Sequence, residues 1–160
     1  MLVTAGYASA AALYGLFLTL NVVRNRRRLE VSLGDGSRES LIELMQLSAE
    51  EGPTALKDPK KTSPAASKYF KLTQAVRAHG NFIENAPWIY FLIALGEYNG
   101  MSAPLVHALG GAFLAGRIAH SFGILGNKHS VGLARALSMA STFLVIGVAS
   151  VWNIVKLIQQ

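Results

Sequence analysis

The chain has 160 residues, of which 51% are hydrophobic and only 15% are charged, and its formal net charge is +6. In soluble domains about a quarter of the residues are charged, so this composition indicates a membrane protein, with a soluble bundle of fully buried helices as the alternative. The absence of cysteine excludes disulfides, thiolate metal sites and a cysteine nucleophile.

The first predicted element is a membrane span from Val3 to Val23. These 21 residues carry no charge, and as a helix they would extend roughly 30 Å, the thickness of one hydrocarbon core. The basic run Arg24 to Arg28 follows directly. A signal peptide has its positive charge before the apolar stretch, so the order seen here predicts an uncleaved first span.

A long loop, at about residues 24–68, comes next. Residues 38–51 are typical of a short amphipathic helix, which we expect either to lie on the membrane surface, to cover the mouth of a site, or to pack against the bundle. The segment Gly52 to Ala66 contains three prolines and several lysines and is predicted to be an exposed linker.

Three further spans are predicted at about Ala75–Tyr98, Pro104–Leu125 and Leu133–Ile158. The second contains ionisable residues, so its hydropathy is weak, but none of the helices shows a wide polar face. The predicted fold is therefore an all-α integral membrane protein, a bundle of four transmembrane helices in a single domain of residues 1–160. Small residues spaced by four in the third span predict close helix contacts.

The distribution of basic residues predicts the orientation. Ten of the fifteen Lys and Arg residues lie between Arg24 and Lys71, the loop around Asn99 has none, and the last loop has Lys128. Basic loops stay on the cytoplasmic side, so both termini are expected on the other side. The net charge is thus mainly a topology signal and a contact with membrane lipid. No nucleic-acid partner is expected, because no basic stripe contains interleaved aromatics.

The most informative polar residues lie in the second span. Arg77, Asn81 and Glu84 are spaced i, i+4 and i+7, so they share one helix face, whereas His79 points to a different side. Ionisable groups at membrane depth usually face a bundle interior or a water-filled cavity. Arg77, Asn81 and Glu84 together could bind a zwitterionic ligand. The alternative is an Arg–Glu pair that only holds helices together.

The third span carries a second polar pair, Arg117 and His120, spaced i, i+3. The pair could belong to a site or be satisfied core residues. His107 and His129 lie near span ends and carry no comparable signal. No spacing of His, Asp or Glu predicts a metal site, and Gly34-Asp35-Gly36 is interpreted only as a turn.

These motifs resemble the MAPEG family, the membrane-associated proteins of eicosanoid and glutathione metabolism. The resemblance lies in four spans, a basic loop after the first, the pattern Arg77-x-x-x-Asn81-x-x-Glu84-x-x-Pro87, and Arg117-x-x-His120. The segments Ser32–Gly36 and Arg77–Phe82 look most like the microbial branch, which is similar to microsomal glutathione transferases.

The resemblance implies a homotrimer that binds glutathione, as co-substrate, between protomers near the cytoplasmic side. Arg77, Asn81 and Glu84 would hold the tripeptide, and His79 would reach in from a neighbouring protomer. Arg117 and His120 would line the site, and a basic residue among Arg24–Arg28 could contribute. Arg135 would be the catalytic residue that stabilises the glutathione thiolate. Asn85 and Ile124 stand where eicosanoid members carry aromatic residues.

The predicted function is a glutathione-dependent transferase or peroxidase that acts on a small apolar electrophile or a lipid hydroperoxide. The alternative is a non-enzymatic member of the family that binds lipid or is an accessory subunit of a larger membrane complex. A channel is disfavoured, because the polar residues gather at one level instead of lining a path.

Overall fold

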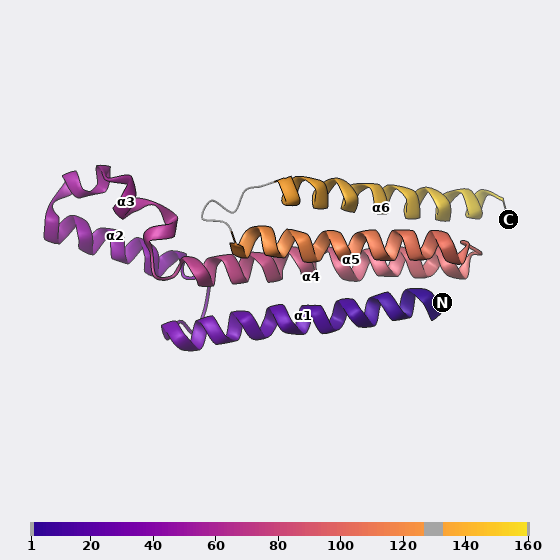
Figure 1. Ribbon diagram of the computed structural model, residues 1–160, viewed down its shortest axis with the longest axis horizontal. Helices are drawn as coiled ribbons and strands as arrows, with labels where there is room; N and C mark the ends of the chain where they lie inside the picture. Colours follow the sequence, from indigo (N-terminus) through magenta and orange to yellow (C-terminus); the bar gives the residue numbers. More distant parts are fainter. Residues whose placement is uncertain (1, 127–132, 160) are drawn as a thin grey trace.

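The computed structural model describes residues 2–126 and 133–159, and the described residues form helices and short connections without any strand (Figure 1). Lys128 and His129 lie outside the described residues. The elements in chain order are α1 (Leu2–Leu29), α2 (Ser37–Glu51), the 3-10 turn η1 (Pro53–Lys57), α3 (Pro59–Thr62), the 3-10 turn η2 (Pro64–Ala66), α4 (Phe70–Tyr98), α5 (Ala103–Gly126) and α6 (Leu133–Ile158).

The four long helices α1, α4, α5 and α6 run side by side along the length of the molecule (Figure 1). Helix α4 contacts each of the other three, while α5 also packs on α1 and α6. The two ends of the chain lie at the same end of this bundle. A face of α4 is therefore in the middle of the molecule, where its side chains can meet residues from the other helices.

Three helical segments are long and apolar enough to cross a membrane: α1, α5 and residues Arg135–Ile158 of α6. The bounds of α6 agree with the predicted span. Helix α1 continues six residues past Val23, because a helix can extend beyond the hydrocarbon region through arginine and leucine, which are good helix formers. Helix α4 starts five residues before Ala75 and continues through Pro87.

The core of the bundle consists of apolar side chains from all four long helices. Glycines allow two of the helix contacts. A Cβ atom on Gly110 would lie 2.7 Å from a ring carbon of Tyr7 on α1, and one on Gly116 would lie 3.3 Å from Ser141 Oγ on α6. Ser141 Oγ also donates to the Ala112 carbonyl at 3.2 Å. The small-residue spacing of the third span thus marks a real close approach, here to α6.

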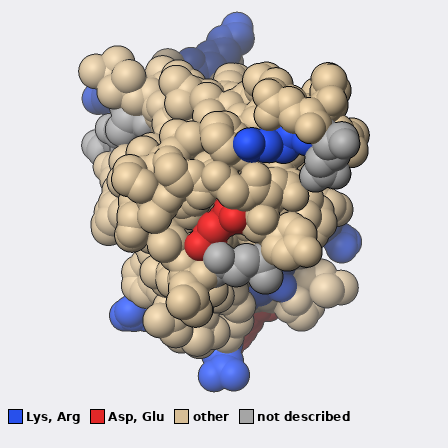
Figure 2. All heavy atoms as spheres, turned by 90° about the vertical axis from the view of Figure 1, so that its right-hand side faces the viewer, with Lys and Arg blue, Asp and Glu red and all other residues tan. Residues whose placement is uncertain are grey.

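Polar side chains tie the helices together at the end of the bundle that carries the termini. The Glu97 carboxylate accepts from the backbone N–H groups of Val3 (3.2 Å) and Thr4 (3.0 Å), which satisfies donors that a helix start leaves unpaired. Asn153 Nδ2 donates to the Leu92 carbonyl at 3.0 Å. Figure 2 shows this end of the molecule, where charged side chains are sparse among uncharged ones.

The insert, residues 37–68, extends beyond the opposite end of the bundle (Figure 1). Helix α2 packs mainly on η1, within the insert itself, and has no fully buried residue. Ser67 Oγ donates to Glu43 at 2.6 Å, which joins α2 to the residues just before α4. The predicted linker is confirmed as largely exposed, but it is coiled into the short turns η1, α3 and η2.

Candidate functional site

The predicted polar face of α4 lies on a cavity of about 500 Å³. Arg77, Asn81 and Glu84 line this cavity together, so their common face is confirmed. Arg26, from the basic end of α1, lines it from the other side. Arg77 and Glu84 are exposed and Asn81 is half-buried, so both charged groups can reach a ligand without first breaking a buried contact.

An adjoining cavity of about 260 Å³ brings α6 to the same face of α4. Arg135 lines it together with Arg77 and Asn81, and Ile124 of α5 contributes an apolar side chain. Two residues of α4 are therefore shared between the two cavities. The structure brings together four of the predicted site residues, Arg77, Asn81, Glu84 and Arg135, around one stretch of α4.

His79 lies on another side of α4, as its spacing from Arg77 predicts. Its Nε2 is 3.1 Å from Thr19 Oγ1 on α1, and this hydroxyl also lies 3.0 Å from the Gly15 carbonyl. His79 lines neither of the two cavities. A contact of His79 with ligand in a neighbouring protomer stays a prediction.

Arg117 and His120 lie behind the cavities, in the interior of the bundle. They are only 1% and 2% exposed. Arg117 Nη2 donates to the Ser138 carbonyl at 3.3 Å and to Thr142 Oγ1, both on α6, and Nη1 lies 3.5 Å from the Asn81 carbonyl of α4. Arg117 therefore links three helices within one protomer. Direct binding of a ligand by either residue stays a prediction.

Asp35 also lines the larger of the two cavities on α4, hereafter the larger cavity. The sequence alone did not indicate this residue. The sequence predicts Gly34-Asp35-Gly36 only as a turn, because nothing local to it indicates that it folds onto α4. The available signal was its position within the Ser32–Gly36 segment that resembles the microbial branch.

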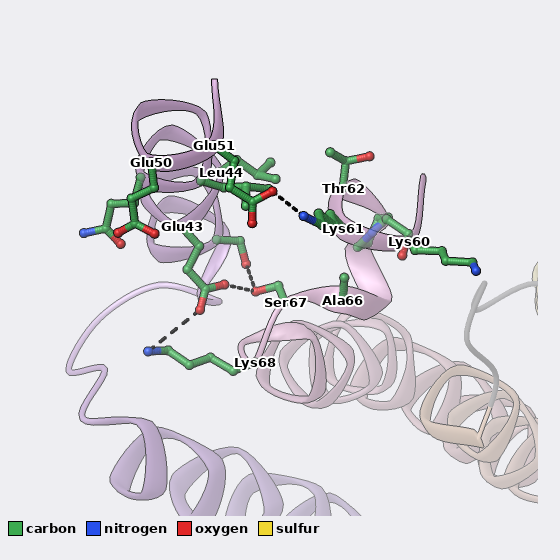
Figure 3. Close-up of a pocket in the computed structure, with 15 residues that line it drawn as sticks. Glu43, Leu44, Glu50, Glu51, Lys60, Lys61, Thr62, Ala66, Ser67 and Lys68 are labelled. Carbon is green, nitrogen blue, oxygen red and sulfur yellow. Dashed lines mark hydrogen bonds and ion pairs between the residues drawn. The ribbon is translucent and has the colours of Figure 1, made fainter. Parts of the chain in front are cut away.

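The insert contains a separate cavity, of about 610 Å³, lined by residues of α2 and of the segment that follows it (Figure 3). Its charged side chains largely pair with one another: Lys61 with Glu51, and Lys68 with Glu43 at 3.8 Å. None of the site residues predicted from the sequence lines this cavity. Within residues 2–126 and 133–159, no three His, Asp or Glu side chains gather as metal ligands would.

Known proteins resemble this chain over nearly its whole length. The model of the MAPEG family matches residues 4–155. The chain is 27% identical over 154 residues to "Inner membrane protein YecN" of Escherichia coli strain K12, which covers 94% of this chain and 92% of that protein. The same values hold for the protein of that name in strain O6:H1. No solved structure matches this chain. With its apolar helices, this chain is a membrane protein and belongs to the MAPEG family.

Proposed function

We propose that this protein is a glutathione-dependent transferase or peroxidase that acts on apolar electrophiles or lipid hydroperoxides. The observation that carries the proposal is that Arg77 and Asn81 of α4 line one cavity with Arg135 of α6 and another with Glu84. Guanidinium groups bind carboxylates in a two-pronged geometry, while the Asn81 amide offers a donor and an acceptor. A tripeptide with two carboxylates, an ammonium and a thiol matches this set of partners.

The chemistry required of the protein is modest. A thiol with a reference pKa near 8.5 is mostly protonated at neutral pH, and a nearby guanidinium favours the thiolate. In the transferase reaction, the thiolate sulfur bonds to the electrophilic carbon while the leaving group departs with its electron pair. In the peroxidase reaction, the thiolate sulfur takes one peroxide oxygen as the O–O bond breaks, which gives a glutathione sulfenic acid and an alcohol. A second glutathione then reduces the sulfenic acid, and glutathione disulfide and water form.

We propose that α4 is a fourth membrane span. With 29 residues, α4 is about 43 Å long, and its apolar side packs on α1 and α5. Its ionisable residues face cavities, as is usual for such groups in membranes. Four spans would place both termini on one side, and the basic insert end would be cytoplasmic.

The proposed assembly is a homotrimer with glutathione at each interface between protomers. Membership of the MAPEG family supports it. The exposure of Arg77 and Glu84 in the single chain supports it too, because these charges are left open to a neighbouring protomer. An apolar substrate would then enter from the surrounding lipid.

The first test is glutathione binding to the detergent-solubilised protein, with the ultraviolet absorbance of the thiolate followed in the same titration. We expect saturable binding with a thiolate signal. Arg135→Ala should remove the thiolate signal, Arg135→Lys should retain part of it, and Arg38→Ala, an exposed change on α2, should leave it intact. An undiminished thiolate signal in Arg135→Ala would reject the catalytic role of Arg135.

The second test uses Arg77→Ala. Loss of charge-assisted hydrogen bonds to a carboxylate should weaken glutathione binding by roughly 10–100-fold, while native mass spectrometry still detects the trimer. Dissociation of the trimer with unchanged affinity per chain would instead make Arg77 a structural residue. Absence of binding in the wild type would reject the enzymatic proposal.

A specific observation favours the alternative of an accessory subunit. On α2 the side chains of Leu41, Ile42 and Met45 are exposed, and this helix stands beyond the bundle. An apolar strip in that position is suited to docking another protein. If the wild type does not bind glutathione, co-purification with and without Leu41→Ser and Met45→Ser becomes the decisive experiment.

A further inference from the structure

The turn between α1 and α2 is built from glycines that no other residue could replace easily. Gly34 and Gly36 have φ of 81° and 84°, in the left-handed region that favours glycine. Gly36 is also buried, and a Cβ atom there would lie 2.9 Å from Tyr69 Cβ. Asp35 is thus held at the tip of a sharp turn pressed against the start of α4.

Side chains from two long helices fix the backbone of this turn. Arg26 Nη2 of α1 donates to the Gly34 carbonyl, and Thr73 Oγ1 of α4 donates to the Asp35 carbonyl, each at 2.8 Å. The turn therefore belongs to the bundle and not to the insert that follows. This anchoring places the Asp35 side chain on the cavity that Arg77 and Glu84 also line.

The Asp35 carboxylate is charged at neutral pH. Hydrogen bonds from Ser37 hold the pKa of Asp35 below its usual value, and the positive charge of Arg77 acts in the same direction. The larger cavity thus contains two guanidinium groups, Arg26 and Arg77, and two carboxylates, Asp35 and Glu84. Such a mixture suits the end of an amino acid, where a free carboxylate and an ammonium are attached to the same carbon.

We propose that Asp35 binds the ammonium group of the γ-glutamyl end of glutathione, so that the Gly34–Gly36 turn selects ligands with a free α-amino acid end. The inference rests on the proposed glutathione-dependent function and identifies the part of the ligand that the larger cavity recognises. Glu84 is a second partner for the ammonium, and Arg26 and Arg77 bind the carboxylate beside it. The remainder of the tripeptide, including its thiol, extends along Arg77 and Asn81 toward Arg135.

The charge balance of the whole site agrees with this arrangement. Three arginines and two carboxylates line the two cavities, which gives a net charge of about +1. Glutathione with its thiol protonated carries two carboxylates and one ammonium, a net charge of about −1. A site of arginines alone would bind the carboxylates but would repel the ammonium.

Asp35 also has a structural contact that the test must separate from ligand binding. Its Oδ1 accepts from the Ser37 backbone N–H at 3.1 Å, at the start of α2. Asparagine retains a side-chain carbonyl oxygen that accepts this hydrogen bond. Asp35→Asn therefore removes the charge and leaves the local fold intact.

The experiment compares glutathione with its desamino analogue, glutaryl-cysteinylglycine, by calorimetric titration of the solubilised full-length protein. The wild type should bind glutathione about tenfold more tightly than the analogue, because an ammonium–carboxylate hydrogen bond is lost. In Asp35→Asn the ratio of the two affinities should fall toward one, because only the binding of glutathione becomes weaker. The control Glu50→Gln, which removes an equal charge from an exposed position on α2, should keep the preference.

Each other outcome has a distinct meaning. If Asp35→Asn lowers the affinity for both ligands equally, the proposal is overturned and the turn is purely structural. Equal affinity of the wild type for both ligands would overturn it while the glutathione-dependent function stands. If the wild type binds neither ligand, both the inference and the proposed function fail.

Discussion

At the residue scale, Arg117 is the side chain whose environment differs most from what its spacing alone indicates. Its guanidinium lies in the interior, and no carboxylate among the described residues lies within ion-pair distance of it. Its partners are oxygen atoms of α4 and α6, the Met139 sulfur of α6 at 3.8 Å, and the face of Phe113, 5.6 Å away. Burying a charge without a carboxylate partner is costly. The hydrogen bonds to α6 offset part of this cost and hold Arg117 in one position.

This environment predicts that Arg117 stabilises the bundle. Arg117→Ala should lower the free energy of unfolding by about 2–4 kcal/mol, because it leaves a cavity and removes the hydrogen bonds to α6. Thr142→Val, which removes one of those partners, should cost about 1 kcal/mol. Thermal unfolding in detergent measures both variants. If Arg117→Ala retains wild-type stability but loses most of its glutathione affinity, Arg117 contacts the ligand instead.

At the element scale, the long helices could be predicted largely from the sequence. Helix α6 has the predicted bounds, because an apolar run marks the hydrocarbon-spanning part of a helix. The observed start of α4 and the observed end of α1 differ from the predicted ones. Helices continue past the hydrocarbon region, where polarity no longer marks their limits. The common face of Arg77, Asn81 and Glu84 follows from helical periodicity alone.

Contacts between elements could not be predicted in the same way. Whether Arg117 faces α6 or the cavity depends on how α5 is rotated against its neighbours, which periodicity does not determine. Asp35 reaches the site because Arg26 and Thr73 hold its turn between α1 and α4. That is a long-range arrangement, and the local sequence shows only two glycines around an aspartate.

The packing of α5 on α1 gives a prediction for glycine substitutions. Gly110→Ala should destabilise the protein by about 1–3 kcal/mol, because the new methyl group would overlap the Tyr7 ring. The matched control is Gly147→Ala on α6, where a Cβ atom meets nothing within 4 Å; this change should be neutral or stabilising by about 0.5–1 kcal/mol. Equal melting temperatures for the two variants would contradict the close approach of α1 and α5.

At the scale of the whole molecule, charge is divided between the two ends of the bundle. The insert end contains most of the basic residues, whereas charged side chains are sparse at the end that carries the termini (Figure 2). The cavities of the candidate site lie on the part of α4 nearer the insert, since Arg77 is about two helical turns from Phe70. Glutathione, which is water-soluble, would then enter from the basic side, while an apolar substrate would enter from the lipid.

This arrangement can be tested directly, because the chain has no native cysteine. Single cysteines at two exposed positions, Lys57→Cys in the insert and Ser102→Cys between α4 and α5, can be probed with a membrane-impermeant maleimide on spheroplasts of a bacterial host. We expect labelling of Ser102→Cys alone in intact spheroplasts and of both variants after permeabilisation, because α4 separates the two positions. Labelling of both from the same side would show that α4 does not cross the membrane, and the site would then lie outside the bilayer. Labelling of Lys57→Cys alone would keep α4 as a span but reverse the orientation, so that glutathione would have to reach the site from the non-cytoplasmic side.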